Sequence, residues 1–186
     1  MEYNTIMELE NRACELRKKI VRYSNYAKIP HLASCLSLVE ILTILYFHHA
    51  NHDPKHPTKK DRDRIVLSKG HGAPALFQTL AMSGYFPESW MFREDHGGGL
   101  FGEHPPTPAH LVGIEAATGS LGHGFPLAVG MALSAKVQKK NYHCYAILGD
   151  GECNEGTIWE AAMFAAGHNI HNLTAIVDYN KWQATG

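Results

Sequence analysis

Apolar residues at three- and four-residue steps mark the start of the chain as an amphipathic helix. Thr5–Glu8 has the form of a capping box, which predicts that the helix begins there, and Pro30 predicts an end near Ala27. A second capping box, Ser37–Glu40, predicts a short and mostly buried second helix. The apolar stripe of the first helix consists of Ile6, Leu9, Ala13, Leu16, Ile20 and Tyr23.

Short β-branched or apolar runs then alternate with helical patterns, and residues 84–118 form a long irregular stretch rich in Gly, Pro and His. This alternation predicts an α/β fold, a three-layer α/β/α domain with a mainly parallel sheet that covers residues 1–186. Since such a sheet usually continues past a last strand of this kind, we expect the domain to be incomplete at its C-terminus. The predicted strands are 64–68, 144–148 and 173–177, and the predicted helices are 74–83, the segment opened by Gly119–Gly124, and 157–167.

Composition and charge narrow the classes of function. The chain has 186 residues, of which 45% are hydrophobic, enough for one domain with a sizeable core. A formal net charge of −1 with 19% charged residues predicts neither nucleic acid nor a membrane as partner. We expect no signal peptide and no membrane span, because the N-terminus lacks a basic region and no apolar run approaches the required length. The four cysteines contain no C-x-x-C pair, which favours a cytoplasmic protein.

The chain has thirteen histidines, several of which crowd the polar stretch His48–Pro57. Histidines this close together are compatible with zinc ligation. A solvated, proline-broken loop is the favoured alternative, because metal sites are normally held by elements that fix the ligand geometry.

Oxygen-bearing side chains follow two of the predicted strands. Asp150 lies between glycines directly after the strand 144–148, and Asn180 follows the strand 173–177, thirty positions further on. That spacing suits a strand, a crossover helix and the next parallel strand, so both side chains are expected at one edge of the sheet. Carboxylate and amide oxygens suit Mg²⁺ or Ca²⁺, and a diphosphate would complete the coordination shell.

The glycine-rich entry to a helix, Gly119–Gly124, offers free backbone N–H groups to a phosphate or to the edge of a pyrimidine ring. His31, His71 and His104 stand in distinctive polar settings. Together these histidines suit a pocket for a phosphate or a sugar hydroxyl, as neutral acceptors or cationic donors.

Five motifs in this order resemble the N-terminal, diphosphate-binding half of transketolase. Their form is similar to transketolases whose two halves are separate polypeptides, and the resemblance runs through nearly the whole chain. The motifs are Ser68-Lys69-Gly70-His71, Gly102-Glu103-His104-Pro105, Thr118-Gly119-Ser120-Leu121-Gly122-His123-Gly124, Gly149-Asp150-Gly151 with Glu155-Gly156, and Asp178-Tyr179-Asn180-Lys181.

The resemblance implies a role for each matched residue. Asp150 and Asn180 would bind the metal through their side chains, and Trp182 through its backbone carbonyl. His31, His71 and His104 form the implied catalytic set, in which His31 and His104 face the sugar. Glu155 would lie at a dimer contact near the cofactor. The implied contacts to thiamine diphosphate come from His71, Gly119, Ser120, Leu121, His123, Gly151, Glu155 and Asn180.

The implied reaction moves a two-carbon ketol unit between sugar phosphates, with thiamine diphosphate supplying the carbanion chemistry. The family places the activating glutamate and the pyrimidine-binding wall in a second domain, so we expect a complementary half and a dimer or heterotetramer. Two departures are Ile29-Pro30 before His31, where the family usually has glycine, and His123, where glutamine is frequent. The alternatives are a related thiamine diphosphate enzyme, such as a deoxyxylulose-phosphate synthase or a 2-oxo-acid dehydrogenase, and a non-catalytic truncated paralogue.

Overall fold

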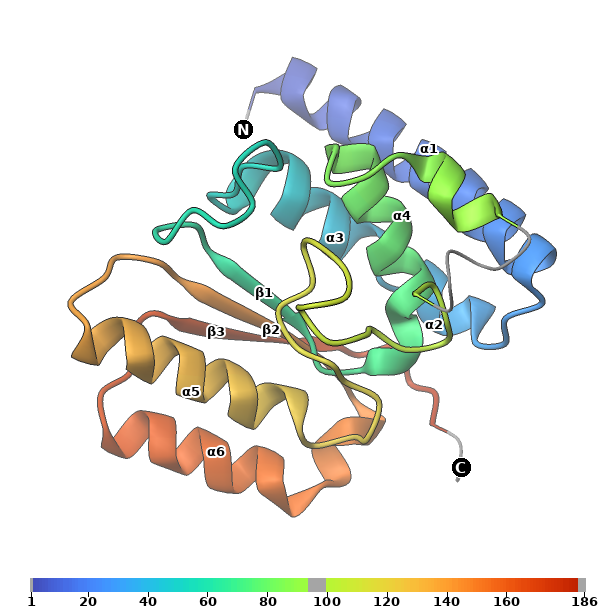
Figure 1. Ribbon diagram of the computed structural model, residues 1–186. Helices are drawn as coiled ribbons and strands as arrows, with labels where there is room; N and C mark the ends of the chain where they lie inside the picture. Colours follow the sequence, from blue (N-terminus) through green and yellow to red (C-terminus); the bar gives the residue numbers. More distant parts are fainter. Residues whose placement is uncertain (1, 94–99, 184–186) are drawn as a thin grey trace. The chain divides into compact units, whose positions relative to one another are not determined.

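The chain is described by a computed structural model over residues 2–93 and 100–183 (Figure 1). It divides into two compact units. The first, unit 1, comprises Met1–Pro57 and His71–His104, and the second, unit 2, comprises Thr58–Gly70 and Pro105–Gly186. The assignment of residues 1–186 to one diphosphate-binding domain stays a prediction.

Unit 1 is built from helices. Tyr23 is fully buried in α1, and its hydroxyl donates a hydrogen bond of 2.6 Å to the carbonyl of Phe101. The predicted apolar stripe of the first helix is confirmed at Ala13, Leu16 and Ile20, which are buried together with Tyr23. It is wrong at Ile6, which is 42% exposed. The elements are α1 (Tyr3–Ala27), α2 (Leu32–Leu36), α3 (Val39–Ile44), the π-helix η1 (Leu45–His49), α4 (Ala73–Ser83) and the 3₁₀ helix η3 (Glu88–Phe92).

Both predicted capping boxes are wrong, although the predicted end of the first helix at Ala27 is confirmed. Helix α1 begins at Tyr3, with Glu2 as N-cap and no side-chain cap. Ser37 ends the unpredicted helix α2 instead of opening α3, and its hydroxyl donates to the carbonyl of Ser34 at 3.1 Å. A serine hydroxyl bonds to a preceding carbonyl as readily as to a following N–H, so the sequence pattern does not distinguish the two ends.

The prediction that no apolar run approaches a membrane span is also wrong by length and composition. Residues 32–49 form a window of 18 residues with a mean hydropathy of 1.4. This window covers three successive helices, α2, α3 and η1. Its apolar residues include Leu38, Val39 and Leu42, which are fully buried, and a core helix of a water-soluble protein passes the same test.

Unit 2 contains a parallel sheet of three strands in the order β1-β2-β3. Each strand lies within a residue or so of its predicted position, and the parallel α/β fold class is confirmed. The strands are β1 (Arg64–Leu67), β2 (Cys144–Gly149) and β3 (Leu173–Asp178), and the helices are α5 (Gly124–Val137) and α6 (Gly156–Gly167). Two short 3₁₀ helices follow strands, η2 (Gly70–Gly72) after β1 and η4 (Gly151–Asn154) after β2.

Helices α5 and α6 lie side by side and share one hydrophobic core with the sheet (Figure 1). Strand β2 is buried along its whole length, and its alternate residues Cys144, Ala146 and Leu148 belong to this core. Small side chains of α5, among them Ala128 and Ala132, let the helix approach the strands closely. Because Gly149 pairs with Asp178 across β2 and β3, the chain segments after both strands leave the sheet at the same edge.

Candidate functional site at the carboxyl edge of the sheet

Asp150 and the segment after β3 meet at this edge, as the sequence predicts. The Asp150 carboxylate accepts the N–H of Lys181 at 2.8 Å through one oxygen and the N–H of Gly151 at 3.1 Å through the other. Lys181 takes up a left-handed conformation with φ of 64°, which turns the chain so that its N–H points at Asp150. The carboxylate and Asn180 are therefore neighbours in space.

Asn180 is oriented by its own contacts. Its amide nitrogen lies 3.4 Å from a carboxylate oxygen of Asp178, and its amide oxygen accepts the N–H of Trp182 at 2.9 Å. The three expected metal ligands, Asp150, Asn180 and Trp182, are thus brought together by backbone hydrogen bonds of one turn. Their oxygens are hard donors of the kind that Mg²⁺ and Ca²⁺ prefer. Their role as ligands stays a prediction.

The glycine segment before α5 approaches its neighbours at backbone distance. A Cβ atom on Gly122 would stand 2.5 Å from the hydroxyl of Thr157, and Gly122 has a φ of 85°. A Cβ atom on Gly70 would stand 2.7 Å from the backbone nitrogen of Gly119. Only glycine fits both positions, so this edge has the close backbone approach that phosphate-binding turns require.

A buried acid, Glu152, ties the loops of this edge together. Its side chain is 1% exposed, and its Oε1 atom accepts the Ser68 hydroxyl at 2.6 Å and the Gly122 N–H at 2.9 Å. Its Oε2 atom accepts the N–H of Gly149 at 3.2 Å. Glu152 therefore contacts the ends of β1 and β2 and the entry to α5.

A buried ion pair braces the end of β3. The Lys69 ammonium lies 2.6 Å from a carboxylate oxygen of Asp178, and the two side chains are 1% and 8% exposed. Since Lys69 follows β1 and Asp178 ends β3, the pair spans the sheet at its carboxyl edge. The same Asp178 carboxylate faces the amide of Asn180.

A free thiol, Cys153, lies near the carboxylates of this edge. Burial raises the pKa of the Cys153 thiol, and the neighbouring charges of Glu152 and Asp150 raise it further. The raised pKa keeps the Cys153 thiol protonated and neutral near pH 7.

The structure places the other predicted cofactor-binding residues around the same loops. Ser120 and His123 are exposed, and a ring nitrogen of His123 lies 3.2 Å from the carbonyl oxygen of Leu121. Glu155 is exposed at the N-cap of α6. A Cβ atom built on Gly122 would stand 2.9 Å from the Cβ atom of Glu155. No residue in this group has a contact that assigns it to a ligand, so their binding roles stay predictions.

In unit 1, two of the three predicted catalytic histidines come together. The rings of His31 and His71 have centroids 5.5 Å apart, with the planes inclined at 56°. His31 follows Pro30 with a φ of 68°, a left-handed conformation that is uncommon outside glycine. His104 is exposed and does not take part in this ring contact.

The histidine-rich stretch 48–57 has structural partners of its own. One ring nitrogen of His52 lies 2.6 Å from the Tyr46 carbonyl oxygen and the other lies 3.2 Å from the Tyr85 hydroxyl. His56 lies 2.9 Å from Asp53. Within residues 2–93 and 100–183, no group of three or more His, Cys, Asp or Glu side chains is arranged to hold a metal ion. The centre proposed around Asp150 uses one carboxylate and two neutral oxygens instead.

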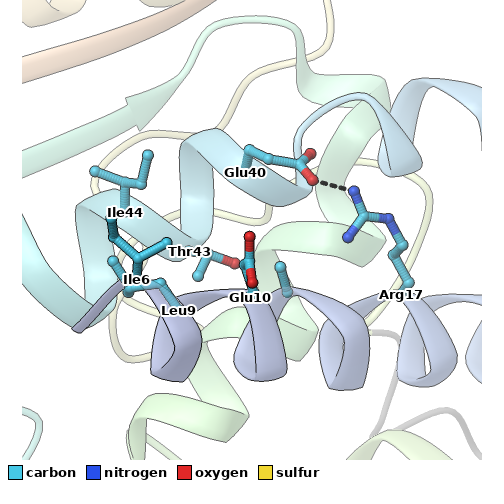
Figure 2. A pocket seen from close by; sticks show the side chains of 8 residues that line it. Ile6, Leu9, Glu10, Arg17, Glu40, Thr43 and Ile44 are labelled. Atoms are coloured by element: carbon cyan, nitrogen blue, oxygen red, sulfur yellow. Dashed lines mark hydrogen bonds and ion pairs between the residues drawn. The ribbon is translucent and has the colours of Figure 1, made fainter. Parts of the chain in front are cut away.

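A separate groove of about 380 Å³ lies in unit 1 between α1 and α3 (Figure 2). Most of its wall is apolar, and the ion pair of Arg17 with Glu40 borders one end. None of the predicted site residues lines it. The lining residues are Ile6, Leu9, Glu10, Ala13, Arg17, Glu40, Thr43 and Ile44.

Sequence reasoning gave no role to Ser68, Lys69, Glu152 and Asp178, although all but Glu152 stand in the quoted motifs. Each is a buried polar or charged residue at or just beyond the end of a strand, where charged side chains are rarely buried without a purpose. The signal was present in the Lys and Asp that directly follow the apolar runs of β1 and β3. Ser68 and Glu152 are 84 residues apart in the chain, and Lys69 and Asp178 are 109 apart. Hydrophobic periodicity cannot reveal contacts over such separations.

Known proteins resemble this chain over most of its length. The family model described as "Transketolase, thiamine diphosphate binding domain" matches residues 13–186. The chain is 43% identical over 180 residues to the 6-deoxy-6-sulfo-D-fructose transketolase subunit SqwG of Clostridium sp. (strain MSTE9), covering 97% of this chain and 65% of that protein. It is 44% identical over 180 residues to an apulose-4-phosphate transketolase subunit of Actinobacillus succinogenes, covering 96% of this chain and 65% of the relative.

Solved structures show the same fold. A transketolase from Campylobacter jejuni superposes with a TM-score of 0.82 at 34% identity, over 96% of this chain and 29% of that one. A transketolase from Leishmania mexicana superposes with a TM-score of 0.79 at 27% identity, over 91% of this chain and 27% of that one. The chain spans 65% of the length of the two relatives from Clostridium and Actinobacillus.

Proposed function

Because the chain belongs to the family of transketolase thiamine diphosphate-binding domains, we propose that it is the diphosphate-binding component of a transketolase. In this proposal it works with a complementary pyrimidine-binding half, in a dimer or heterotetramer, and moves a two-carbon ketol unit between sugar phosphates of the pentose phosphate type. Two similar proteins bear the word subunit in their names, which supports a partner. The free thiols of all four cysteines suit the cytoplasm, where we place the enzyme.

The observation that carries the proposal is the meeting of Asp150 with the Asn180–Trp182 turn beside the glycine segment. An ionised carboxylate has about four lone-pair positions, of which the two N–H contacts of Asp150 use two. The Asn180 amide oxygen likewise has a lone pair beyond the one given to Trp182. The donor set therefore retains capacity for Mg²⁺ or Ca²⁺.

Thiamine diphosphate, when bound, supplies the carbanion chemistry of ketol transfer. The residues of this chain hold and orient it: Asp150, Asn180 and the Trp182 carbonyl hold the metal, and the backbone N–H groups of Gly119–Leu121 and of Gly151 hold the diphosphate. In unit 1, His31, His71 and His104 exchange protons with sugar hydroxyls, since the two nitrogens of an imidazole ring can donate and accept hydrogen bonds.

The decisive experiment is a titration of thiamine diphosphate into Asp150→Ala, both with and without Mg²⁺, with Asp53→Ala as matched control. Asp53 also accepts a backbone N–H, at 3.0 Å from Lys55, but lies on an exposed loop of unit 1. We expect Asp150→Ala to bind the cofactor more than about tenfold more weakly and to lose the dependence on Mg²⁺, since it removes a metal ligand. Asp53→Ala is expected to bind like the wild type. Full Mg²⁺-dependent binding by Asp150→Ala would refute the site.

Activity tests the substrate and partner parts of the proposal. The chain supplied with its complementary half is assayed with xylulose 5-phosphate, apulose 4-phosphate and 6-deoxy-6-sulfofructose as ketol donors. Turnover of any of these by the assembled pair, and by neither half alone, supports a transketolase of separate components. An assembled pair that binds thiamine diphosphate and turns over pyruvate instead supports the related synthase or dehydrogenase class.

A further inference from the structure

Three separate chain segments converge on the buried carboxyl group of Glu152. Ser68 directly follows β1, Gly149 is the last residue of β2, and Gly122 belongs to the glycine segment that leads into α5. All three donate to Glu152, at 2.6, 3.2 and 2.9 Å respectively. The Glu152 side chain thus links the two glycine segments that we assign to the diphosphate, the one before α5 and the one after β2.

The direction of each hydrogen bond is fixed. The Ser68 hydroxyl accepts the N–H of Phe125 at 3.0 Å, so its own proton is directed to Glu152. Backbone N–H groups at Gly122 and Gly149 can only donate. Glu152 is therefore linked directly to the two loops and, through the Ser68 hydroxyl, to the first turn of α5.

This arrangement is costly as a device for stability alone. Glu152 is 1% exposed, and no Lys, Arg or His of residues 2–93 and 100–183 forms a salt bridge with it. A buried acid held only by neutral donors contributes less to folding than a well-packed apolar side chain of the same volume. The cost is understandable if the carboxyl group serves to place neighbouring groups.

We propose that Glu152 is a positioning residue for cofactor binding, an inference that rests on the proposed function. It turns the N–H groups of Gly122 and Gly149 inward, and thereby presents the adjacent Gly119–Leu121 and Gly151 N–H groups and Asp150 toward the diphosphate and its metal. Glu152 acts through these groups and does not touch the ligand. Preorganised donors bind without the cost of ordering two glycine loops.

The test is Glu152→Gln in the enzyme assembled with its complementary half. With the amide oxygen retained at Ser68 and Gly122, the amide NH₂ group faces the N–H of Gly149, and one of the three hydrogen bonds is replaced by two opposed donors. We expect the KM for thiamine diphosphate at fixed Mg²⁺ to rise about ten- to hundredfold, the range typical of groups that orient ligands from behind. A merely structural loss lowers the amount of active enzyme and leaves this KM unchanged.

Asn172→Ala is the matched control. Asn172 donates two side-chain hydrogen bonds, to the carbonyls of Ala132 at 3.0 Å and Tyr142 at 3.3 Å, at the amino-terminal end of β3. The Asn172→Ala change therefore removes a comparable number of hydrogen bonds from unit 2, but at a place away from the loops that Glu152 contacts. The inference is overturned if Asn172→Ala raises the KM as much as Glu152→Gln, or if Glu152→Gln keeps the wild-type KM.

Ser68→Ala keeps the inference testable if Glu152→Gln does not fold. It removes one donor to Glu152, and we expect a smaller rise in the same KM, because the change weakens the same network. A wild-type KM in Ser68→Ala would count against the network. A wild-type enzyme that itself fails to bind thiamine diphosphate with Mg²⁺ would refute the proposed function instead.

Discussion

The buried pair of Lys69 and Asp178 offers a prediction with a magnitude. The change Asp178→Asn keeps the shape of the side chain but removes the negative charge 2.6 Å from the Lys69 ammonium, which is 1% exposed. Removing one partner of a buried ion pair typically costs about 3–5 kcal/mol, because the remaining charge stays buried. The amide oxygen of asparagine can still accept from Lys69, so we expect a loss near the lower bound, about 3 kcal/mol.

The assay is urea unfolding followed by circular dichroism, with midpoint and slope fitted separately. For a chain of this length, a loss of about 3 kcal/mol corresponds to a fall in melting temperature of about 6–12 °C. Glu8→Gln is the matched control, since it makes the same carboxylate-to-amide change in the exposed pair of Glu8 with Arg12. Exposed pairs of this spacing contribute about 0.3–0.5 kcal/mol. Equal losses in both variants would refute the view that Lys69 and Asp178 are a desolvated pair.

Three further predictions follow from packing and titration. Gly122→Ala is expected to lose cofactor binding and about 1–3 kcal/mol of stability, because the new Cβ atom would stand 2.5 Å from the Thr157 hydroxyl at a residue with positive φ. Unaltered unfolding and cofactor binding would contradict this. Iodoacetamide at pH 8 should label exposed Cys14 and spare Cys144, whose pKa burial raises to about 12, as peptide mass spectrometry can check. Desolvation by burial, aided by a neighbouring phenol, raises the pKa of Tyr23 to about 12, so the folded state keeps this proton longer. Its contribution to stability is full below about pH 10 and is lost as pH rises to about 12, and Tyr23→Phe should flatten that fall in the free energy of unfolding.

The sequence predicts the regular elements of unit 2 closely because their signals are local. Each strand is a compact apolar run bounded by glycine or charge, and α6 ends at the glycine that marks its predicted end. The edge position of Asp150 and Asn180 follows from strand order and the parallel crossover alone. Helix starts are predicted less well. Thr5 and Ser37 fit a capping-box pattern, but Thr5 lies inside α1 and Ser37 is the C-cap of α2.

The partners of the supporting groups of the site are not predictable from local pattern. Lys69 and Glu152 read as ordinary charged residues in turns, and only tertiary contacts bury them. Their partners come close only because β1, β2 and β3 pair side by side, and no window of ten or twenty residues contains all three strands. Ser68, Lys69 and Asp178 stand inside the quoted motifs, but only their burial and tertiary contacts show that they support the site.

The contacts at the carboxyl edge also determine when the site forms during folding. Ser68 and Glu152 are separated by 84 residues, and Lys69 and Asp178 by 109, so both contacts close long loops of the chain. Such non-local contacts are made late, after local helices have formed, because the loop entropy has to be overcome first. A ligand that needs the completed edge binds only the native state. It therefore slows unfolding and leaves the rate of refolding unchanged, which protects the finished protein without guiding its assembly.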